Sequence, residues 1–491
     1  MAKDRKTMEI QQINTEPAKA DATMPENGHW RDLFAPGLGA ATVMVSLGVG
    51  LHAFNAFLVS TALPSAIAEL GGAQWLPWTS TLYLAASIIA GASCASLKAR
   101  VGTRSALAIV TLVFLSGTLT AGLAGSMAGI IIGRVLQGLG EGAVLALCYM
   151  LISTLFPRRL IARIFGIEAA VWAVSAFGGP VLAGLLTEAI SWRAAFLVNV
   201  PAGIVFLVLA RIAVPKGEKN GKNSANPGGL PIGRLSLLLV GLVLLLAANL
   251  TALDISRNTM IGMALAAFML FVALDRNSLQ PILPAGAFVA STPVGLGLWI
   301  VLLMPLSEAA LGVYLVYTLQ HLWSMGPMAA GSLSALMAVS WSVTAVITAN
   351  ISTQKARERL ILLGVLTEAC GLVGITLAIA TGYLPGLILS LIAVGMAFGM
   401  AWAALSQTMM EASPPDDRDR TSALLPTLQT AGYAMGAALA GLIANRSGFS
   451  GTASPEVLRH AVGNSVLFGL VCLAPAILLA PWMVRSLRKT P

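Results

Sequence analysis

A few polar and ionisable side chains interrupt apolar runs that otherwise carry almost no charge. They are His52 and Asn55 in one run, Arg134 and Glu141 in another, and Glu308 in a third. A carboxyl group among apolar atoms favours its neutral form and exchanges protons near neutral pH, whereas a nearby cation favours the charged form. An acid whose distance from a cation changes during a working cycle can therefore carry protons. The pattern predicts that Glu141 and Glu308 bind protons or substrate, with Arg134 as the switching countercharge.

Other side chains in these runs are candidates for contact with a substrate. His52 and Asn55 are expected to hydrogen-bond it, and further residues could line a cavity: Tyr83, Trp402, Gln429 and Tyr433. The alternative for each position is a static polar contact between helices, or plain packing. The four cysteines lie inside apolar runs without a CxxC pair, which favours core packing. We expect no catalytic residue, no metal, no cofactor and no enzyme activity.

The elements that position these side chains are predicted to be membrane-spanning helices. Of the 491 residues, 57% are hydrophobic and 10% are charged, whereas soluble proteins carry about 25% charged residues. A helix of about 20 apolar residues crosses a bilayer. Fourteen apolar runs are long enough, at about 39–63, 77–97, 105–124, 128–152, 162–186, 194–214, 235–253, 259–274, 293–318, 328–350, 360–380, 385–409, 421–444 and 462–483. The predicted fold class is an all-α polytopic membrane protein.

An internal repeat organises these runs. An offset of 257 positions relates Lys98-Ala99-Arg100 to Lys355-Ala356-Arg357, and also Gly138 to Gly395. The halves are therefore predicted to be parallel, as in transporters whose site lies between two repeats at the membrane midplane. The predicted domains are a disordered cytoplasmic tail (1–36), a six-helix half (37–214), a cytoplasmic linker with two inserted helices (215–290), a second six-helix half (291–485) and a short cytoplasmic tail (486–491).

The net charge of +9 comes from 30 basic and 21 acidic residues. Of the 30 basic residues, 24 lie in the tails and in the segments that follow even-numbered runs. Basic residues concentrate on the cytoplasmic side of membrane proteins, so both termini are predicted to be cytoplasmic and the protein to lie in the inner membrane. The basic loops are short and lack interleaved aromatic residues, which argues against a nucleic-acid partner.

Several motifs carry a resemblance to a known family. The fourth run contains Arg134-Val135-Leu136-Gln137-Gly138-Leu139-Gly140, and the fifth contains Gly179-Pro180 followed by Gly184. Over residues 37–485 the sequence resembles the major facilitator superfamily, and it is most similar to the fourteen-span branch that holds drug:proton antiporters. The resemblance implies two parallel six-helix halves plus two inserted helices. It also implies a role in proton coupling for Arg134.

The resemblance further implies a set of gating residues. They comprise the loop residues Lys98, Arg100, Gly102 and Arg104, their repeats Lys355 and Arg357, and Gly179, Pro180 and Gly184 in the fifth run. The two basic loops are expected to latch the outward-facing state. Two positions depart from the family pattern, because Ala99 and Asn55 stand where the family usually has aspartate.

These observations predict a secondary active transporter that moves a small organic solute across the inner membrane by alternating access. The motifs favour proton-coupled efflux of drugs or metabolites. The alternative is uptake of a specific nutrient, such as a vitamin like riboflavin, which the two missing aspartates and the polar His52 and Asn55 favour. The expected partners are the solute, a proton or other coupling ion, and the lipid bilayer, with the protein as a monomer.

Overall fold

In the computed structural model, the residues described are 30–215, 232–250, 254–278, 281–284, 286–348, 351, 353–414 and 417–488. Within these ranges the secondary structure consists of α-helices and two short 3-10 helices. Most of the two predicted tails and part of the linker lie outside the described residues. At the end of the predicted N-terminal tail, η1 (Trp30–Phe34) forms a 3-10 turn with Leu33 buried.

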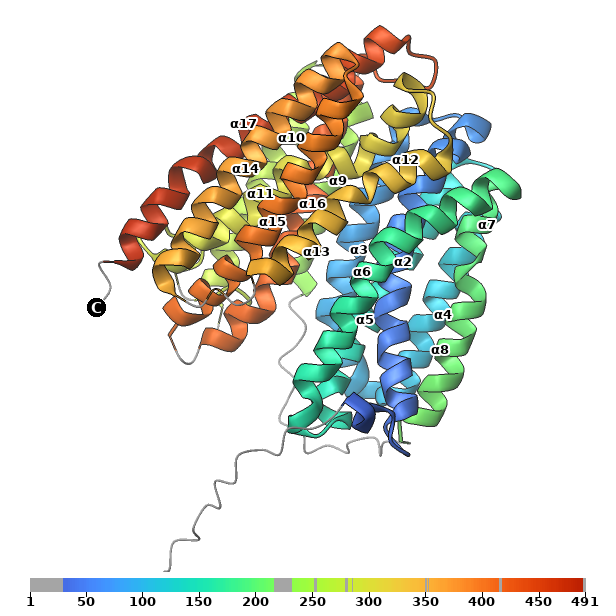
Figure 1. Ribbon diagram of the computed structural model, residues 1–491, viewed down its shortest axis with the longest axis vertical. Helices are drawn as coiled ribbons and strands as arrows, with labels where there is room; N and C mark the ends of the chain where they lie inside the picture. The colour runs from blue at the N-terminus through green and yellow to red at the C-terminus, as the bar shows by residue number, and fades with distance from the viewer. Residues whose placement is uncertain are drawn as a thin grey trace, which may run out of the picture.

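The α-helices in the described ranges fall into two sets of seven, with two inserted helices between them. The N-terminal half contains α2 (Gly39–Leu70), α3 (Leu76–Val101), α4 (Thr103–Gly122), α5 (Met127–Leu155), α6 (Arg158–Ala189) and α7 (Trp192–Leu197), which is followed by α8 (Asn199–Ala213). The inserted helices are α9 (Ile232–Leu250) and α10 (Asp254–Arg276). The C-terminal half contains α11 (Pro293–Leu322), α12 (Pro327–Ser334), α13 (Leu336–Thr348), α14 (Gln354–Thr381), α15 (Leu384–Ala412), α16 (Arg418–Arg446) and α17 (Pro455–Leu487). Figure 1 shows the first half in blue to green and the second in yellow to red.

The internal repeat is visible in how the helices pack. Gly138 on α5 lies so close to α3 that a Cβ there would be 2.3 Å from the carbonyl oxygen of Tyr83. Gly395 on α15 repeats this approach, because its Cβ would be 2.0 Å from Oγ of Ser340 on α13. The partner residues Tyr83 and Ser340 are themselves related by the offset of 257. The pairs α4–α5, α2–α6 and α2–α8 likewise recur as α14–α15, α11–α16 and α11–α17. The two halves are therefore structural repeats.

The number of candidate membrane spans is lower than the fourteen predicted apolar runs. Among the described residues, 11 helices are long and apolar enough to cross a membrane, and α9 supplies a shorter apolar helix, Gly233–Ala248. The long helices α3 and α16 are not among the 11. They pack against each other between the halves, where Thr81 Oγ1 donates a hydrogen bond to Ala434 O at 3.3 Å. A helix enclosed by protein needs less apolar surface than one in contact with lipid, so the count of fourteen stays a prediction.

The inserted helices cover the junction of the two halves. Leu242 of α9 packs with Ala85 of α3 and Ala434 of α16. Arg234 at the start of α9 forms an ion pair with the buried Asp275 at the end of α10. The Asp275 carboxylate also accepts hydrogen bonds from the backbone N–H groups of residues 282 and 283. The inserted helices thus contact both halves through α9. Asp275 fixes the end of α10 to the chain that leads into α11.

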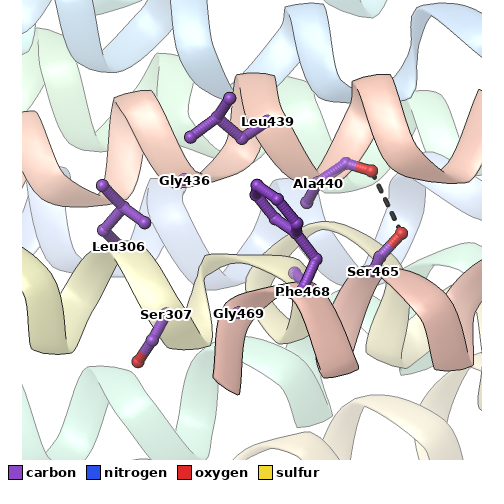
Figure 2. Close-up of a pocket in the computed structure, with 9 residues that line it drawn as sticks. Leu306, Ser307, Gly436, Leu439, Ala440, Ser465, Phe468 and Gly469 are labelled. Atoms are coloured by element: carbon purple, nitrogen blue, oxygen red, sulfur yellow. Dashed lines mark hydrogen bonds between the residues drawn. The ribbon is translucent and has the colours of Figure 1, made fainter. Parts of the chain in front are cut away.

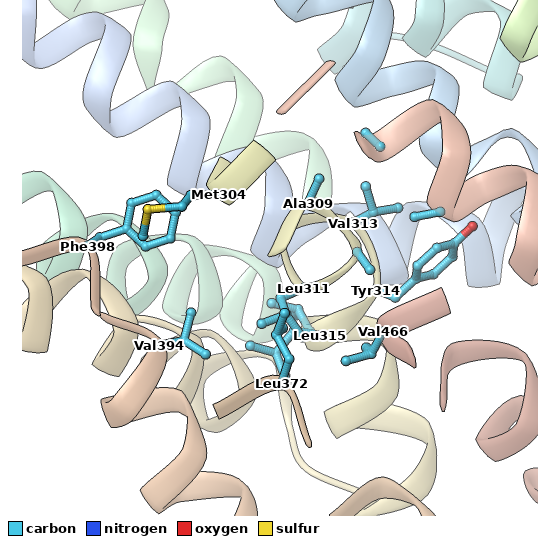
Figure 3. Packing of buried hydrophobic residues seen from close by; sticks show 14 of the residues in the cluster. Met304, Ala309, Leu311, Val313, Tyr314, Leu315, Leu372, Val394, Phe398 and Val466 are labelled. Atoms are coloured by element: carbon cyan, nitrogen blue, oxygen red, sulfur yellow. The ribbon is translucent and has the colours of Figure 1, made fainter. Parts of the chain in front are cut away.

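The centre of the C-terminal half is α11, whose side chains are nearly all buried. Figure 3 shows Leu311 and Leu315 of this helix near Leu372 of α14 and Val466 of α17, within one hydrophobic cluster. Peripheral helices instead expose large apolar side chains, among them Ile212, Met269 and Leu478. Such exposure is stable in contact with lipid chains. The buried helix α11 is instead an inner helix, which can hold polar groups away from lipid.

Candidate functional site

The N-terminal half contains a polar cluster centred on Tyr83. Its hydroxyl donates a hydrogen bond to Glu141 Oε2 at 2.6 Å and lies 3.2 Å from Nδ1 of His52. The guanidinium carbon of Arg134 lies 3.8 Å from the centre of the Tyr83 ring. Tyr83, Arg134 and Glu141 are buried, while the His52 side chain is 15% exposed. Four predicted residues on α2, α3 and α5 thus come together.

The geometry of Arg134 differs from a simple ion pair with Glu141. Its Nη1 donates to Gln137 Oε1 at 2.9 Å and its Nε donates to Thr79 O at 3.4 Å. Tyr83 lies between the two charged groups, with the cation on its ring face and the carboxylate at its hydroxyl. A cation over an aromatic face is attracted by about 2 kcal/mol when desolvated. The ring therefore links the charge of Arg134 to that of Glu141.

Asn55 lies inside the half, where it joins three helices. Its Oδ1 accepts hydrogen bonds from Gln137 Nε2 at 3.3 Å and from Asn199 Nδ2 at 3.2 Å. Its side chain is 0% exposed. These contacts hold α5, which carries Arg134, against α2 and α8. Gln137 lies inside the motif of the fourth run and Asn199 lies outside the quoted motifs, and neither amide had been predicted to have a role.

His52 also contacts an aromatic residue that the sequence analysis missed. Its ring makes an edge contact with Trp172 of α6, with centroids 5.8 Å apart. Trp172 is 36% exposed. The imidazole therefore lies between a buried tyrosine hydroxyl and a partly exposed indole. This position is suited to a polar group that contacts a solute.

In the C-terminal half, Glu308 of α11 and Tyr433 of α16 come together. The Tyr433 hydroxyl donates to Glu308 Oε1 at 2.7 Å, while Oε2 is buried without a hydrogen-bond partner. Gln429 lies one turn before Tyr433, and its Nε2 is also buried without a partner. Trp402, the remaining candidate for a cavity wall, packs against the hydrophobic cluster of this half, as Tyr433 also does. The structure thus brings together Glu308 and Tyr433, and a role for Trp402 stays a prediction.

A second buried acid of this half is absent from the sequence candidates. Glu368 on α14 is 0% exposed and accepts a hydrogen bond from Ser307 Oγ at 2.7 Å. Ser307 directly precedes Glu308 in the sequence. Glu368 interrupts the apolar run at about 360–380, so the criterion that selected Glu141 and Glu308 would also have found it.

The two polar clusters lie on helices that touch. Thr81, which bonds to Ala434 across the junction of the halves, lies two residues before Tyr83, and Tyr433 directly precedes Ala434. Glu141 and Glu308 each lie close to the middle of their helices. The clusters therefore occupy similar depths on opposite sides of the junction, as expected for a site at the midplane.

Two of the three predicted gating residues of α6, Pro180 and Gly184, lie where the halves meet. A Cβ on Gly184 would be 2.2 Å from Cα of Met328 on α12. A Cβ on Gly331 of α12 would be 3.1 Å from Cβ of Pro180. Gly179 faces α2 instead, with Phe57 Cβ 2.8 Å from its own Cβ position. Glycine at 184 thus permits two backbones from different halves to touch.

Contacts between the halves gather at one end of the molecule. Met328 N donates to Glu188 Oε1 at 2.9 Å, and Asn445 Nδ2 donates to Gln74 O at 3.2 Å. Glu188, Met328 and Asn445 lie at ends of α6, α12 and α16, and Gln74 lies in the 3-10 helix η2 (Ala73–Trp75) just before α3, at the end opposite to Lys98 and Arg100. The halves are therefore joined at the end away from the basic loops.

Among the described residues, the basic loops form no hydrogen bond or ion pair between the halves. Gly102, with φ of 83°, forms the turn between α3 and α4, and no described acidic residue pairs with Lys98, Arg100 or Arg104. In the C-terminal repeat Lys355 is exposed, and Arg357 pairs with Glu411 of α15 at 2.5 Å. Whether these loops latch another state stays a prediction.

Comparisons with known proteins agree with this architecture. The model of the Major Facilitator Superfamily matches residues 45–437. A probable multidrug-efflux transporter of Mycobacterium tuberculosis (strain H37Rv) is 31% identical over 439 residues, which cover 86% of this chain and 91% of that protein. The cephamycin export protein CmcT of Amycolatopsis lactamdurans is 29% identical, with 92% and 93% covered.

Solved structures with the same fold are more distant in sequence. A POT peptide transporter in complex with sulfate superposes with a TM-score of 0.65 at 16% identity, covering 92% of this chain and 95% of that chain. A D-xylose-proton symporter gives 0.64 at 16% identity, with 91% and 97% covered. These two show the fold alone. Together with the family match and the efflux relatives, they confirm the resemblance drawn from the sequence: the chain belongs to the Major Facilitator Superfamily and is a multi-pass membrane transporter rather than an enzyme.

Proposed function

We propose that this transporter exports amphiphilic organic compounds from the cytoplasm in exchange for protons, across the inner membrane and with both termini in the cytoplasm. The single observation that carries the proposal is the contact of Tyr83 with both Glu141 and Arg134. A buried acid held near a buried cation can change its protonation when a small movement alters their separation. The names of the efflux relatives support export over uptake.

The arrangement of the halves supports a direction for the cycle. The halves touch at the end away from the basic loops, and the positive-inside rule assigns the basic end to the cytoplasm. The conformation is thus cytoplasm-facing, so a solute enters from the cytoplasm and contacts His52 and Glu308. Glu141 and Glu308 release protons to the cytoplasm. The halves then rock to face the outside, where protons bind and the solute leaves. A potential of 100 mV contributes about 2.3 kcal/mol per charge moved.

The test uses inside-out membrane vesicles with an imposed pH gradient, and ethidium as the amphiphilic probe. We expect vesicles with the protein to accumulate ethidium, and a protonophore to abolish the accumulation. Glu141→Gln and Glu308→Gln should each lower proton-driven uptake by at least about tenfold, because an amide cannot carry the proton. A tenfold loss corresponds to about 1.4 kcal/mol. Both variants should still exchange ethidium down its own gradient. The exposed Glu456→Gln serves as the matched control.

The opposite transport direction has its own readout. Expression in a riboflavin auxotroph, beside susceptibility to ethidium, compares the two functions in one strain. Rescue of the vitamin requirement without any change in ethidium tolerance would replace export by nutrient uptake. Full proton-driven export by Glu308→Gln would remove that residue from the coupling.

A further inference from the structure

Glu368 is a buried carboxyl group that the proposed cycle does not use. It lies close to the middle of α14, it is 0% exposed, and its Oε2 is buried without a hydrogen-bond partner. A charged side chain at the centre of a bilayer costs about 2.5–3.5 kcal/mol on insertion scales. The equivalent position in the first half, 257 residues earlier, is Thr111, which carries no charge. The repeat fold therefore does not require an acid here.

The contact with Ser307 suits both protonation states of Glu368. Ser307 Oγ lies 2.7 Å from Glu368 Oε1 and also 2.7 Å from Met304 O. A hydroxyl has one hydrogen to donate and two lone pairs that accept. If Glu368 is ionised, Ser307 donates to it. If Glu368 is protonated, the acid donates to Ser307, which turns its own hydrogen to Met304 O. Neither state loses the bond between Ser307 and Glu368.

The titratable groups near Glu368 are an acid and a phenol. Glu308 directly follows Ser307, the hydrogen-bond partner of Glu368, and the Tyr433 hydroxyl donates to Glu308. The helices α15 and α17 also pack against α14. They contribute apolar residues, including Val394 and Val466, to the surrounding hydrophobic cluster (Figure 3).

On α14 and α15 and just after α17, the charged side chains that form ion pairs lie at the end of the molecule that carries the basic loops. Glu411 of α15 pairs with Arg357, and Arg488 after α17 pairs with Glu358. No described lysine or arginine pairs with Glu368 or Glu308. Two acids without a cation cannot easily be ionised together, so a proton is the natural counterion of this group.

The pocket on the other side of Ser307 does not explain these groups. It lies between α11, α16 and α17, and its polar side chains are Ser307 and Ser465. Figure 2 shows the Ser465 hydroxyl bonded to the backbone oxygen of Ala440, and the Ser307 hydroxyl turned away from Gly436 and Leu439. The pocket thus offers no free polar group to a solute, and the contact of Ser307 is directed toward Glu368.

We propose that Glu368 is a second proton-binding residue of the C-terminal half, which exchanges its proton through Glu308. The inference rests on the proposed function, in which Glu308 is the first proton-binding acid of this half. Glu308 is 6% exposed and Glu368 is 0% exposed, so water reaches Glu308 first. In the transfer, the O–H bond of Glu308 breaks and its proton binds the Glu368 carboxylate. Glu308 then takes another proton from water, so that this half binds two protons.

The test needs no substrate, because the ligand is the proton itself. Infrared difference spectra of the protein in lipid vesicles, taken across a pH titration, follow the C=O band of protonated carboxyl groups. Glu368→Gln should remove one such band, and the number of protons that this half releases should fall from two to one. Ser307→Ala should keep the band and move its midpoint, and Glu456→Gln should leave it unchanged. A Glu368→Gln spectrum identical to that of the wild type would overturn the proposal.

A second variant covers a failure of Glu368→Gln to fold. Glu368→Asp keeps the acid in a new position, so its band should shift, and an unshifted band would equally overturn the proposal. Ethidium transport in the same vesicles separates the two proposals. If Glu368→Gln loses the carboxyl band but the wild type shows no proton-driven transport, only the proposed function is contradicted. Intact proton-driven transport with an unchanged band contradicts only the role of Glu368.

Discussion

In the N-terminal half, a buried acid and a buried cation contact one ring, because Glu141 and Arg134 both touch Tyr83. In the C-terminal half, Glu308 is buried beside Ser307, which bonds to the buried Glu368, and no described lysine or arginine pairs with either acid. The first cluster can balance its own charge. The second needs protons or a cationic solute to do so. The two halves are thus suited to different steps of one cycle.

The difference arises within a repeat that is otherwise well preserved. The approach of Gly138 to α3 recurs at Gly395. The offset of 257 relates Arg134 to Leu391 and Glu141 to Phe398, whereas Glu308 and Glu368 correspond to Leu51 and Thr111. Helix packing is therefore shared between the halves and the polar chemistry is not. A duplicated helix bundle can therefore keep the same helix contacts in both halves while its charged residues occupy different positions in each half.

The largest expected effect comes from giving the N-terminal half the residue of its repeat. Arg134→Leu copies Leu391 and leaves Glu141 without its cation, because Tyr83 alone cannot compensate a buried carboxylate. Proton-driven ethidium uptake should fall by about a hundredfold, which corresponds to 2.8 kcal/mol. Downhill exchange in the same vesicles controls for folding. Normal coupled uptake would show that the half does not need its own countercharge.

The next effect concerns the close contact between the two halves at Gly184. In Gly184→Ala the new methyl group would be 2.2 Å from Cα of Met328, so the two backbones must separate. We expect transport to fall by about tenfold, because such a clash costs about 1–3 kcal/mol. A cysteine near Glu188 should also become more reactive to a membrane-impermeant thiol reagent. Gly178→Ala is the matched control on the same helix, since its methyl group meets Phe54 at an ordinary 3.6 Å.

A paired substitution separates shared packing from unshared chemistry. Gly138→Ala and Gly395→Ala should each destabilise the protein by about 1–3 kcal/mol, because both introduce a methyl group into a tight helix contact. Thermal unfolding in detergent measures this loss. Only Gly138→Ala displaces Tyr83, so only that variant should also lose proton coupling. Equal coupling in both would contradict the assignment of Tyr83. Gly463→Ala, which has open space around it, should not destabilise.

The smallest effect is expected at the basic end of the C-terminal half. Glu411→Gln removes the ion pair with Arg357, but the Glu411 side chain is 53% exposed. Exposed ion pairs contribute about 0–1 kcal/mol, so unfolding and ethidium uptake should both remain close to those of the wild type. A strong loss of transport would instead indicate that this pair takes part in the conformational change.

Much of the site could be predicted because its residues are rare in apolar runs. Arg134, Glu141 and Glu308 stand out by charge alone, and the motif around Arg134 supported the selection. Glu368 meets the same criterion and was missed by omission. Asn199 bonds to Asn55 across 144 positions, a pairing that no local pattern announces. The role of Trp402 stays a prediction, since an aromatic residue in a helix can face either the core or a cavity.

The sequence by itself determined the all-helical membrane fold, the repeat and the family. These properties follow from local apolar length and from a constant offset, both of which are written along the chain. Only the tertiary structure decided that Tyr83 separates Arg134 from Glu141, that Ser307 contacts Glu368, and that the halves meet at the end away from the basic loops. The reason is physical. Hydropathy fixes how a helix relates to lipid, whereas the face that it turns to another helix depends on close packing between residues far apart in sequence.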